Sequence, residues 1–273
     1  MNYIEIIGPP GVGKSTLLKA LVNRRKNERW KTYQEAIINI ANTLKWKQLG
    51  SSKSQLLYVL NKINVSKYKE LGLANTIVQY EASQIANSIK KKYEYFVDAE
   101  FEALNKMPLR ISAINKSSFL SWHIKSLNKL FIMEAFGYMP TVIFAEGPCK
   151  THHGLKYIQE HKVTADTLPR AIIYCTLSAK DNIKRIQTRA TATGSVSTIH
   201  NQLNDEQLET LVLYTHQVAE ENLTFLKRLG IPTYELNLTD TQSDVELNHI
   251  QDFITENINN SRHSLLDFAR IYP

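Results

Sequence analysis

The sequence predicts an α/β protein with a mostly parallel sheet flanked by helices, and three observations lead to that prediction. Four short runs of residues are almost entirely apolar, as are strands of a sheet that is covered on both faces. Long segments with apolar residues at helical spacing separate most of these runs. The first run also leads directly into a loop rich in glycine and proline, and that loop opens a helical segment.

The expected strands are β-branched or aromatic runs bounded by turn residues. They lie at 3–7, 141–145, 170–177 and 232–238. No strand is expected between the first and the second of these runs. Because the strands are connected through helical segments and not through tight turns, we expect them to run parallel.

Apolar residues three and four positions apart predict the helices. The expected helices cover 16–25, 33–45, 55–63, 74–96, 118–136, 178–189, 205–229 and 244–258. Between the last two, Gly230 provides a stop and Pro232 an entry to the following strand, as expected where a helix gives way to a strand.

A single domain is expected over residues 1–273, since no low-complexity or Gly/Ser-rich linker divides the chain. The helical stretch at about 44–138 interrupts the strand pattern, and we expect it to be a large helical insertion that forms a lid or an acceptor pocket. Residues at about 261–273 are expected to form a C-terminal tail.

Composition indicates a soluble, cytoplasmic protein. The net charge of +7 suits a protein that handles anions, although an excess of this size is also common in proteins without such a role. The two cysteines lack metal-ligand spacing, which favours a reducing compartment and argues against a disulfide framework. The most apolar stretch, 130–145, is too short to span a bilayer and contains Glu134, Gly137 and Pro140.

The loop after the first strand has the spacing of a Walker A phosphate-binding loop. Its glycines let the backbone curl so that N–H groups face phosphate oxygens, and the following helix adds its positive end. Lys14 is expected at the β- and γ-phosphates of ATP or GTP, and the Ser15 hydroxyl is expected to bind Mg²⁺. The predicted nucleotide-binding residues are Gly8, Gly11, Val12, Gly13, Lys14, Ser15 and Thr16.

Three further residues are candidates for catalysis. Glu146 follows an apolar strand and therefore emerges at the carboxyl end of the sheet, where a carboxylate can accept a proton or bind Mg²⁺. Arg185 and Arg189 share one helix face and can stabilise the charge of a transferring phosphate. A polar segment that follows them, at 191–204, is typical of a mobile lid. His152 and His153 follow Glu146 closely and are expected to be exposed loop residues, with contact to substrate as the alternative.

The chain resembles the small P-loop kinases, a group that includes nucleoside, nucleotide, gluconate-type and polynucleotide kinases. The resemblance lies in the loop at 6–16, in the strand that ends at Glu146, and in the strand and helix at 171–189. It covers residues 1–26 and about 140–240. It implies a P-loop NTPase-type fold, ATP and Mg²⁺ as cofactors, and a lid that bears arginines. Related kinases often place an aspartate beside this strand end, whereas Ala145 precedes a lone Glu146, so the base and metal-ligand roles of Glu146 both stay open.

We therefore expect an ATP-dependent phosphotransferase that acts on a hydroxyl or phosphate of a small-molecule acceptor. Lys14, Glu146, Arg185 and Arg189 would form the catalytic set. Two alternatives are kept: a polynucleotide end kinase that uses the basic excess to hold nucleic acid, and a P-loop NTPase switch or regulator without an acceptor. The sequence contains no Asn/Thr-Lys-x-Asp guanine-reading motif, which favours ATP over GTP. It indicates neither the identity of the acceptor nor an oligomeric state.

Overall fold

The computed structural model describes most of the chain and shows the predicted α/β fold. The described residues are 2–25, 28–44, 72, 74–79, 81–82, 91–107, 113–159, 163–164, 166–193, 203–238 and 243–259. The expected helix at 55–63 and the expected tail at 261–273 lie outside these residues. That the chain forms one domain over 1–273 stays a prediction.

Five parallel strands form the sheet, in the order β2-β3-β1-β4-β5. The strands are β1 (Tyr3–Ile7), β2 (Trp30–Thr32), β3 (Thr141–Phe144), β4 (Ala171–Thr176) and β5 (Thr233–Asn237). The four predicted strands are confirmed, each within one residue of the expected bounds. All strands run the same way, so their carboxyl ends meet at one edge of the sheet, where ligands bind in open α/β folds.

Strand β2 was not predicted, and its length explains why. It has three residues, of which Trp30 is buried while Lys31 and Thr32 are half-buried. So short a run carries no period-2 signal, and pairing with β3 defines it as a strand (Trp30 with Thr141, Thr32 with Ile143). Its last residue also caps the next helix, because the Thr32 hydroxyl accepts a hydrogen bond from the Glu35 N–H at 3.2 Å.

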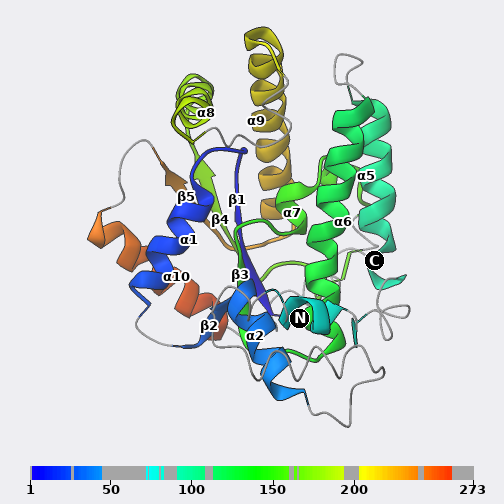
Figure 1. Cartoon of the computed structure of the whole chain (residues 1–273), viewed down its shortest axis with the longest axis vertical. Coiled ribbons are helices and arrows are strands. Elements are labelled where there is room, and N and C mark those ends of the chain that lie inside the picture. The colour runs from blue at the N-terminus through cyan, green and yellow to red at the C-terminus, as the bar shows by residue number, and fades with distance from the viewer. Residues whose placement is uncertain are drawn as a thin grey trace.

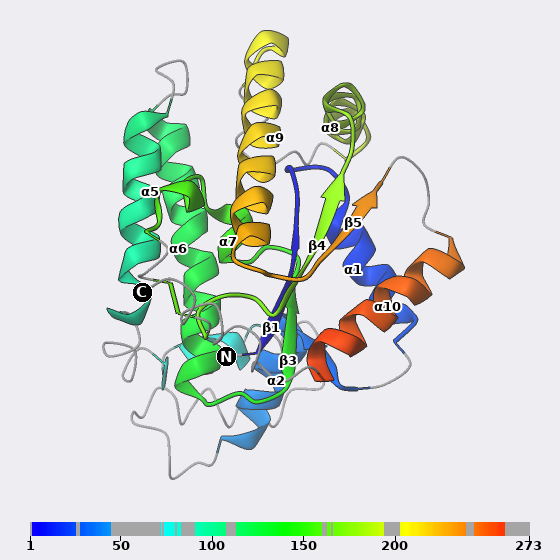
Figure 2. The same cartoon turned by 180° about the vertical axis from the view of Figure 1, so that it is seen from behind.

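The helices cover both faces of the sheet (Figures 1 and 2). In both views α1 and α10 lie on one side of β1, and α5, α6, α7 and α9 lie on the other. The bounds are α1 (Lys14–Asn23), α2 (Tyr33–Thr43), α5 (Glu94–Lys106), α6 (Ala113–Ala135), α7 (Pro148–Thr151), the 3₁₀ turn η2 (Leu155–Tyr157), α8 (Ala179–Thr193), α9 (Asp205–Arg228) and α10 (Asp244–Asn259). Within the described part of the predicted insertion, α5 and α6 confirm that the segment is helical.

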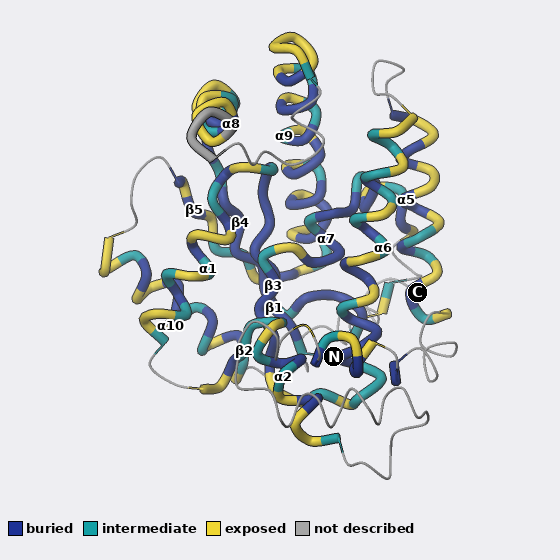
Figure 3. The backbone as a smooth tube through the Cα atoms, in the orientation of Figure 1, coloured by how far each residue is buried: buried dark blue, intermediate teal, exposed yellow. Residues whose placement is uncertain are grey.

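Alternation along the strands builds two separate cores. In β1, Ile4 and Ile6 pack with α1 and α10, whereas Tyr3 and Ile7 pack with α2, α5, α6 and α9. Figure 3 shows β1, β3 and β4 as buried strands, with exposed residues on the outer surfaces of the helices around them. The side chain of Glu5 therefore points to the same face as Tyr3 and Ile7, where it is fully buried.

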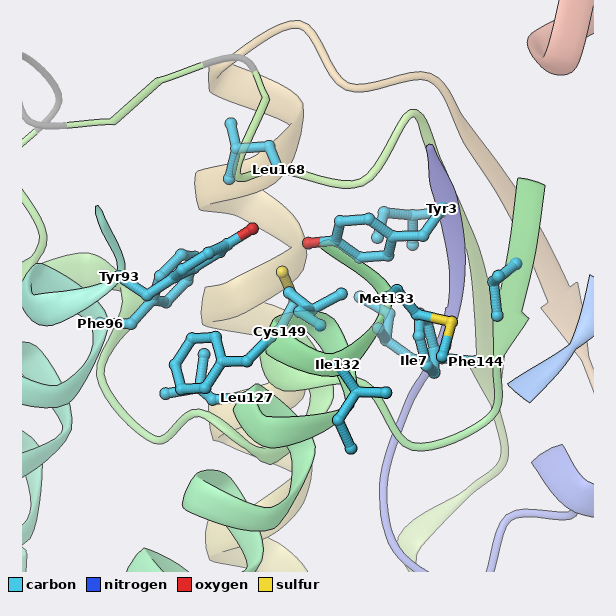
Figure 4. Close-up of a cluster of buried hydrophobic side chains, with 14 of the residues drawn as sticks. Tyr3, Ile7, Tyr93, Phe96, Leu127, Ile132, Met133, Phe144, Cys149 and Leu168 are labelled. Carbon is cyan, nitrogen blue, oxygen red and sulfur yellow. The ribbon is translucent and has the colours of Figure 1, made fainter. Parts of the chain in front are cut away.

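The core on the α6 side joins segments that lie far apart in the sequence. Figure 4 shows Tyr3 and Phe144 from the sheet beside Phe96 from α5, Leu127 from α6 and Cys149 from α7. The rings of Tyr3 and Phe144 meet edge to face at 5.7 Å. This packing holds α6 and α7 against the sheet, and residues of both helices line the candidate site.

No described helix has the length and apolarity that crossing a membrane requires.

Candidate phosphate-transfer site

Left-handed glycines shape the loop between β1 and α1. Gly8, Gly11 and Gly13 all have positive φ, of 138°, 80° and 114°. A Cβ on Gly8 would lie 2.2 Å from the carbonyl oxygen of Cys175 in β4, so the loop can pass this strand only without a side chain. Gly13 is the N-cap of α1 and turns the backbone into that helix. The predicted phosphate loop therefore has the backbone path that its spacing implies.

Lys14, the first residue of α1, lies folded across this loop. Its ammonium group donates hydrogen bonds to the carbonyl oxygens of Gly8 at 2.8 Å and Pro9 at 2.6 Å. Only 5% of the residue is exposed. Burial, with the nearby charge of Lys150, lowers the pKa of Lys14 to about 7. Because phosphate oxygens bind an ammonium more strongly than neutral carbonyls do, an incoming triphosphate would compete for this group and favour its charged form.

One cavity of about 800 Å³ brings the predicted catalytic residues together. Lys14, Glu146, Arg185 and Arg189 all line it. From the predicted nucleotide-binding set, Gly11, Gly13, Ser15 and Thr16 line it as well. Gly8 and Val12 do not line this cavity. Gly8 packs against the Cys175 carbonyl of β4, and the Val12 side chain is buried in the core that contains Leu17 and Leu247.

The two predicted arginines project from α8 toward the phosphate loop. Arg185 donates to the carbonyl oxygens of Val12 at 3.0 Å and of Leu238 at 2.5 Å, so its half-buried guanidinium braces the loop against the end of β5. Arg189, one turn later, is exposed at the cavity wall. Arg189 is therefore the more accessible of the two to a ligand in the cavity.

Glu146 lies just after β3, at the carboxyl edge of the sheet, as predicted. Its side chain is 61% exposed, and its carboxylate lies 4.0 Å from the ammonium group of Lys150. Its backbone carbonyl accepts a hydrogen bond from Lys129 at 2.9 Å. An exposed carboxylate in a wall of cations stays available to a ligand, since no close hydrogen bond to Lys150 holds it.

Several lining residues were not predicted from the sequence. Trp122, Lys125, Ser126 and Lys129 of α6, with Lys150 and Thr151 of α7, form the cavity wall that faces the phosphate loop. The four α6 residues occupy positions i, i+3, i+4 and i+7, which is one face of a helix. That spacing was visible in the sequence, but nothing local indicated that this face would turn toward the loop.

A buried carboxylate in the central strand fixes the segment that carries Glu146 and Lys150. Glu5 accepts hydrogen bonds from the backbone N–H groups of Cys149 at 3.2 Å and Lys150 at 2.5 Å. Gly147 packs against the same carboxyl group, where an added Cβ would lie 2.5 Å from its carbon. Burial raises the pKa of Glu5 to about 7, although the two N–H donors oppose the shift. Sequence reasoning missed Glu5 because it lies inside a strand.

Two more buried polar side chains, one from α5 and one from α9, hold the same segment by hydrogen bonds. Glu100 of α5 accepts hydrogen bonds from the His153 backbone N–H and from His153 Nδ1, both at 2.7 Å. Asn222 of α9 donates to the carbonyl oxygens of Cys149 at 3.1 Å and His152 at 2.7 Å. The expectation that His152 and His153 are exposed is wrong. His152 is fully buried and His153 largely so, because both anchor this segment to α5.

No family model matches the sequence, and no curated protein matches it either. Solved structures that are similar to the chain, all at low identity, include the following three. A shikimate kinase from Bacteroides thetaiotaomicron has 10% identity and a TM-score of 0.37, over 95% of this chain and 99% of that chain. A tRNA isopentenylpyrophosphate transferase from Bacillus halodurans has 13% identity and a TM-score of 0.30, over 98% and 99%. A tRNA delta(2)-isopentenylpyrophosphate transferase from Staphylococcus epidermidis has 14% and 0.24, over 95% and 99%.

The assignment of the fold rests on the molecule itself. A parallel sheet of order β2-β3-β1-β4-β5, with a glycine loop between β1 and α1 and a lysine at the start of α1, is a P-loop NTPase-type fold.

The buried Glu5 predicts a specific dependence of stability on pH. The pKa of Glu5 is higher in the folded state than in the unfolded state. The stability that this group contributes is therefore fully present below about pH 4.5 and is lost as the pH rises through about 7. Glu5→Gln has no titrating group at this position. The unfolding free energy of the wild type, relative to that of Glu5→Gln, should fall between about pH 5 and about pH 8, by about 3 kcal/mol at most. Urea unfolding at both pH values measures it.

Glu209→Gln, which changes an exposed carboxylate of α9, is the matched control and should leave the pH dependence of the wild type unchanged. A difference between the wild type and Glu5→Gln that is constant or grows with pH would contradict the assignment. It would mean that the two N–H donors keep Glu5 ionised.

The lowered pKa of Lys14 predicts that nucleotide binding takes up a proton. At about pH 8, most of the Lys14 population is neutral in the free protein, and the charged phosphates should restore the charged form. Titration calorimetry with Mg-ADP in two buffers of different ionisation enthalpy, Tris and HEPES, should show net proton uptake. Lys14→Arg keeps a cation that does not lose its proton, so its uptake should be much smaller. Equal uptake in the two proteins would assign the proton to another group.

Proposed function

We propose that the protein is an ATP-dependent phosphotransferase that moves the γ-phosphate of MgATP to a hydroxyl or phosphate oxygen of a small acceptor. One observation supports this proposal most directly: the phosphate loop, a carboxylate and a second wall of side chains line the same cavity. Its volume of about 800 Å³ is within the usual range of small-molecule sites, about 300–1,000 Å³. The loop forms only part of the lining, and a second substrate would contact the rest of it, on α6 and α7.

Each residue then has a role set by its place. Lys14 and the loop amides would bind the β- and γ-phosphates, and Arg189 would contact the transferring group from α8. Arg185 would act mainly by holding the loop, because its guanidinium already binds the carbonyls of Val12 and Leu238. Glu146 would orient the acceptor and accept its proton when the acceptor is a hydroxyl.

The residues present also fit Mg²⁺. Ser15 is exposed at the start of α1 and lines the cavity together with Glu146, and hydroxyl and carboxylate oxygens are the hard ligands that this ion prefers. Ser15 would hold the ion, with Glu146 binding it directly or through water. When bound, Mg²⁺ would neutralise charge on the β- and γ-phosphates. No cluster of three or more His, Cys, Asp or Glu side chains that could hold a metal occurs among the described residues.

In the proposed reaction an acceptor oxygen forms a bond to the γ-phosphorus while the bond from that phosphorus to the β,γ-bridging oxygen breaks. ADP leaves with the electron pair of the broken bond. A hydroxyl acceptor would lose its proton to Glu146, and a phosphate acceptor would have none to lose. The protein contributes positioning and charge stabilisation and forms no covalent intermediate.

Incubation with ATP labelled in its γ-phosphate and pooled nucleosides, nucleotides, sugars and oligonucleotides tests this proposal. A labelled small acceptor, lost in Lys14→Ala, is the expected result. Labelling of oligonucleotides alone would favour the polynucleotide end kinase. Release of inorganic phosphate that depends on Lys14, without any labelled acceptor, would favour a P-loop NTPase switch or regulator.

Glu146→Gln should lower the transfer rate by about 10²–10⁴-fold, the range for loss of a positioned general base, while the affinity for nucleotide persists. A metal-ligand role predicts instead that Mg-nucleotide binding weakens and that added Mg²⁺ partly restores transfer. Rates and affinities measured across a Mg²⁺ series separate the two roles. Glu209→Gln is the control for a lost surface carboxylate. An unchanged transfer rate at ordinary Mg²⁺ would remove Glu146 from the site.

A further inference from the structure

Three lysines that do not belong to the phosphate loop or to α8 line the cavity. Lys125 and Lys129 come from α6, and Lys150 comes from α7. The cations of the nucleotide side, Lys14, Arg185 and Arg189, come from α1 and α8. Figures 1 and 2 place α6 and α8 on opposite sides of β1, so the two sets of cations come from different parts of the fold.

This second wall is a built feature and not a chance accumulation of surface charge. The face of α6 at 122, 125, 126 and 129 lines the cavity, whereas the other faces of the helix carry the buried Phe119, His123, Leu127 and Leu130. Packing of those buried residues fixes the rotation of the helix and thereby turns both lysines toward the phosphate loop. Lys150 is placed by the hydrogen bond from its own backbone N–H to Glu5.

Among the described residues, the lysines of this wall outnumber the carboxylates that line the cavity with them. Lys129 donates to the backbone carbonyl of Glu146 and lies 5.8 Å from the ring centre of Tyr33. Lys150 approaches Glu146 only to 4.0 Å, and its side chain is 9% exposed. Burial lowers the pKa of both groups, and the nearby carboxylates of Glu146 and Glu5 oppose the shift. Among the described residues, Glu146 is the one carboxylate that lines the cavity.

We infer that this wall, Lys125, Lys129 and Lys150, binds a phosphate monoester group on the acceptor, so that the acceptor is itself a phosphorylated small molecule. The inference rests on the proposed function and specifies its substrate class. The formal charges of these three lysines and of Glu146 sum to +2. A phosphate dianion balances this charge, whereas the single negative charge of a carboxylate balances only half of it. Lysine acts as a point charge that suits phosphate, whereas planar carboxylates favour the bidentate fork of arginine.

A phosphate group held at α6 and α7 would also orient the acceptor. With one end fixed at this wall, the rest of the molecule would extend past Glu146 toward the phosphate loop. Trp122 lies on the same helix face and lines the cavity, where its ring offers an apolar surface for the body of the acceptor. Binding energy from the non-reacting phosphate would then position the reacting oxygen, as remote substrate groups commonly do.

Phenyl phosphate, with benzoate as the carboxylate of similar shape, tests the inference by titration of the full-length protein. Saturating Mg-AMP-PNP is added to fill the phosphate loop, and a parallel titration omits it. We expect phenyl phosphate to bind the nucleotide-loaded protein at least about tenfold more tightly than benzoate. Lys125→Gln and Lys129→Gln should each weaken phenyl phosphate binding about tenfold or more, the scale for loss of a charge-assisted contact. Neither should change the affinity for Mg-AMP-PNP.

Lys180→Gln is the matched control, because Lys180 is an exposed lysine of α8 that does not line the cavity, and it should leave both affinities unchanged. Lys125 is exposed, so Lys125→Gln should fold normally and remains decisive if Lys129→Gln does not. Benzoate binding as tight as that of phenyl phosphate, or phenyl phosphate binding unchanged by Lys125→Gln, would overturn the inference.

Failure of the proposed function gives a different result. It would appear as the absence of any labelled acceptor in the γ-phosphate transfer assay, or as no binding of Mg-AMP-PNP by the wild type. The titration without nucleotide would then test the proposed phosphate site by itself. In that titration Lys14→Ala removes binding of phenyl phosphate at the phosphate loop. Phenyl phosphate binding that survives Lys14→Ala and is lost in Lys125→Gln would uphold the phosphate site, and binding lost only in Lys14→Ala would overturn it.

Discussion

The carboxylate of Glu5 joins the central strand of the sheet to the segment that forms one wall of the cavity. That segment, residues 146–154, has little regular structure, and its backbone groups need partners from elsewhere. Glu5 from β1, Glu100 from α5 and Asn222 from α9 provide them, each buried and each bonded to backbone atoms of the segment. A buried polar group left without a partner is costly, so these contacts favour one conformation of the segment over others. The positions of Glu146 and Lys150 depend on this conformation of the segment.

The buried lysines around the cavity also indicate a site for anions. Lys14, Lys129 and Lys150 all lose water on folding, and burial lowers the pKa of each. Lys150 lowers the pKa of Lys14 further, whereas Glu146 and Glu5 oppose the shift. A fold optimised for stability alone would not gather cations around one cavity, and such unfavourable local arrangements are concentrated at functional sites. Anionic ligands would relieve the repulsion among these lysines, and this relief would contribute to the free energy of binding.

Local sequence signals predicted the parts of this molecule that local physics determines. The apolar runs became β1, β3, β4 and β5, and the phosphate loop follows from glycine spacing, because both depend on residues adjacent in the chain. Glu146 was placed at the carboxyl edge for the same reason. Strand β2 was missed because only its pairing with β3 defines it. Glu5 and Lys150 were missed because their contact joins residues 145 positions apart, which no local pattern reveals.

The α6 face illustrates where prediction from sequence stops and why the site still follows from physics. Periodicity predicts a helix at 118–136 and separates its apolar positions from its polar ones. It does not say what the polar face meets, because that depends on how α6 packs against α5, α7 and the sheet. The packing directs Trp122, Lys125 and Lys129 across the cavity from the phosphate loop. The P-loop core thus provides the nucleotide side of the site. The helix inserted between β2 and β3 provides the chemistry of the opposite wall, so the choice of acceptor depends on the insertion and not on the shared fold.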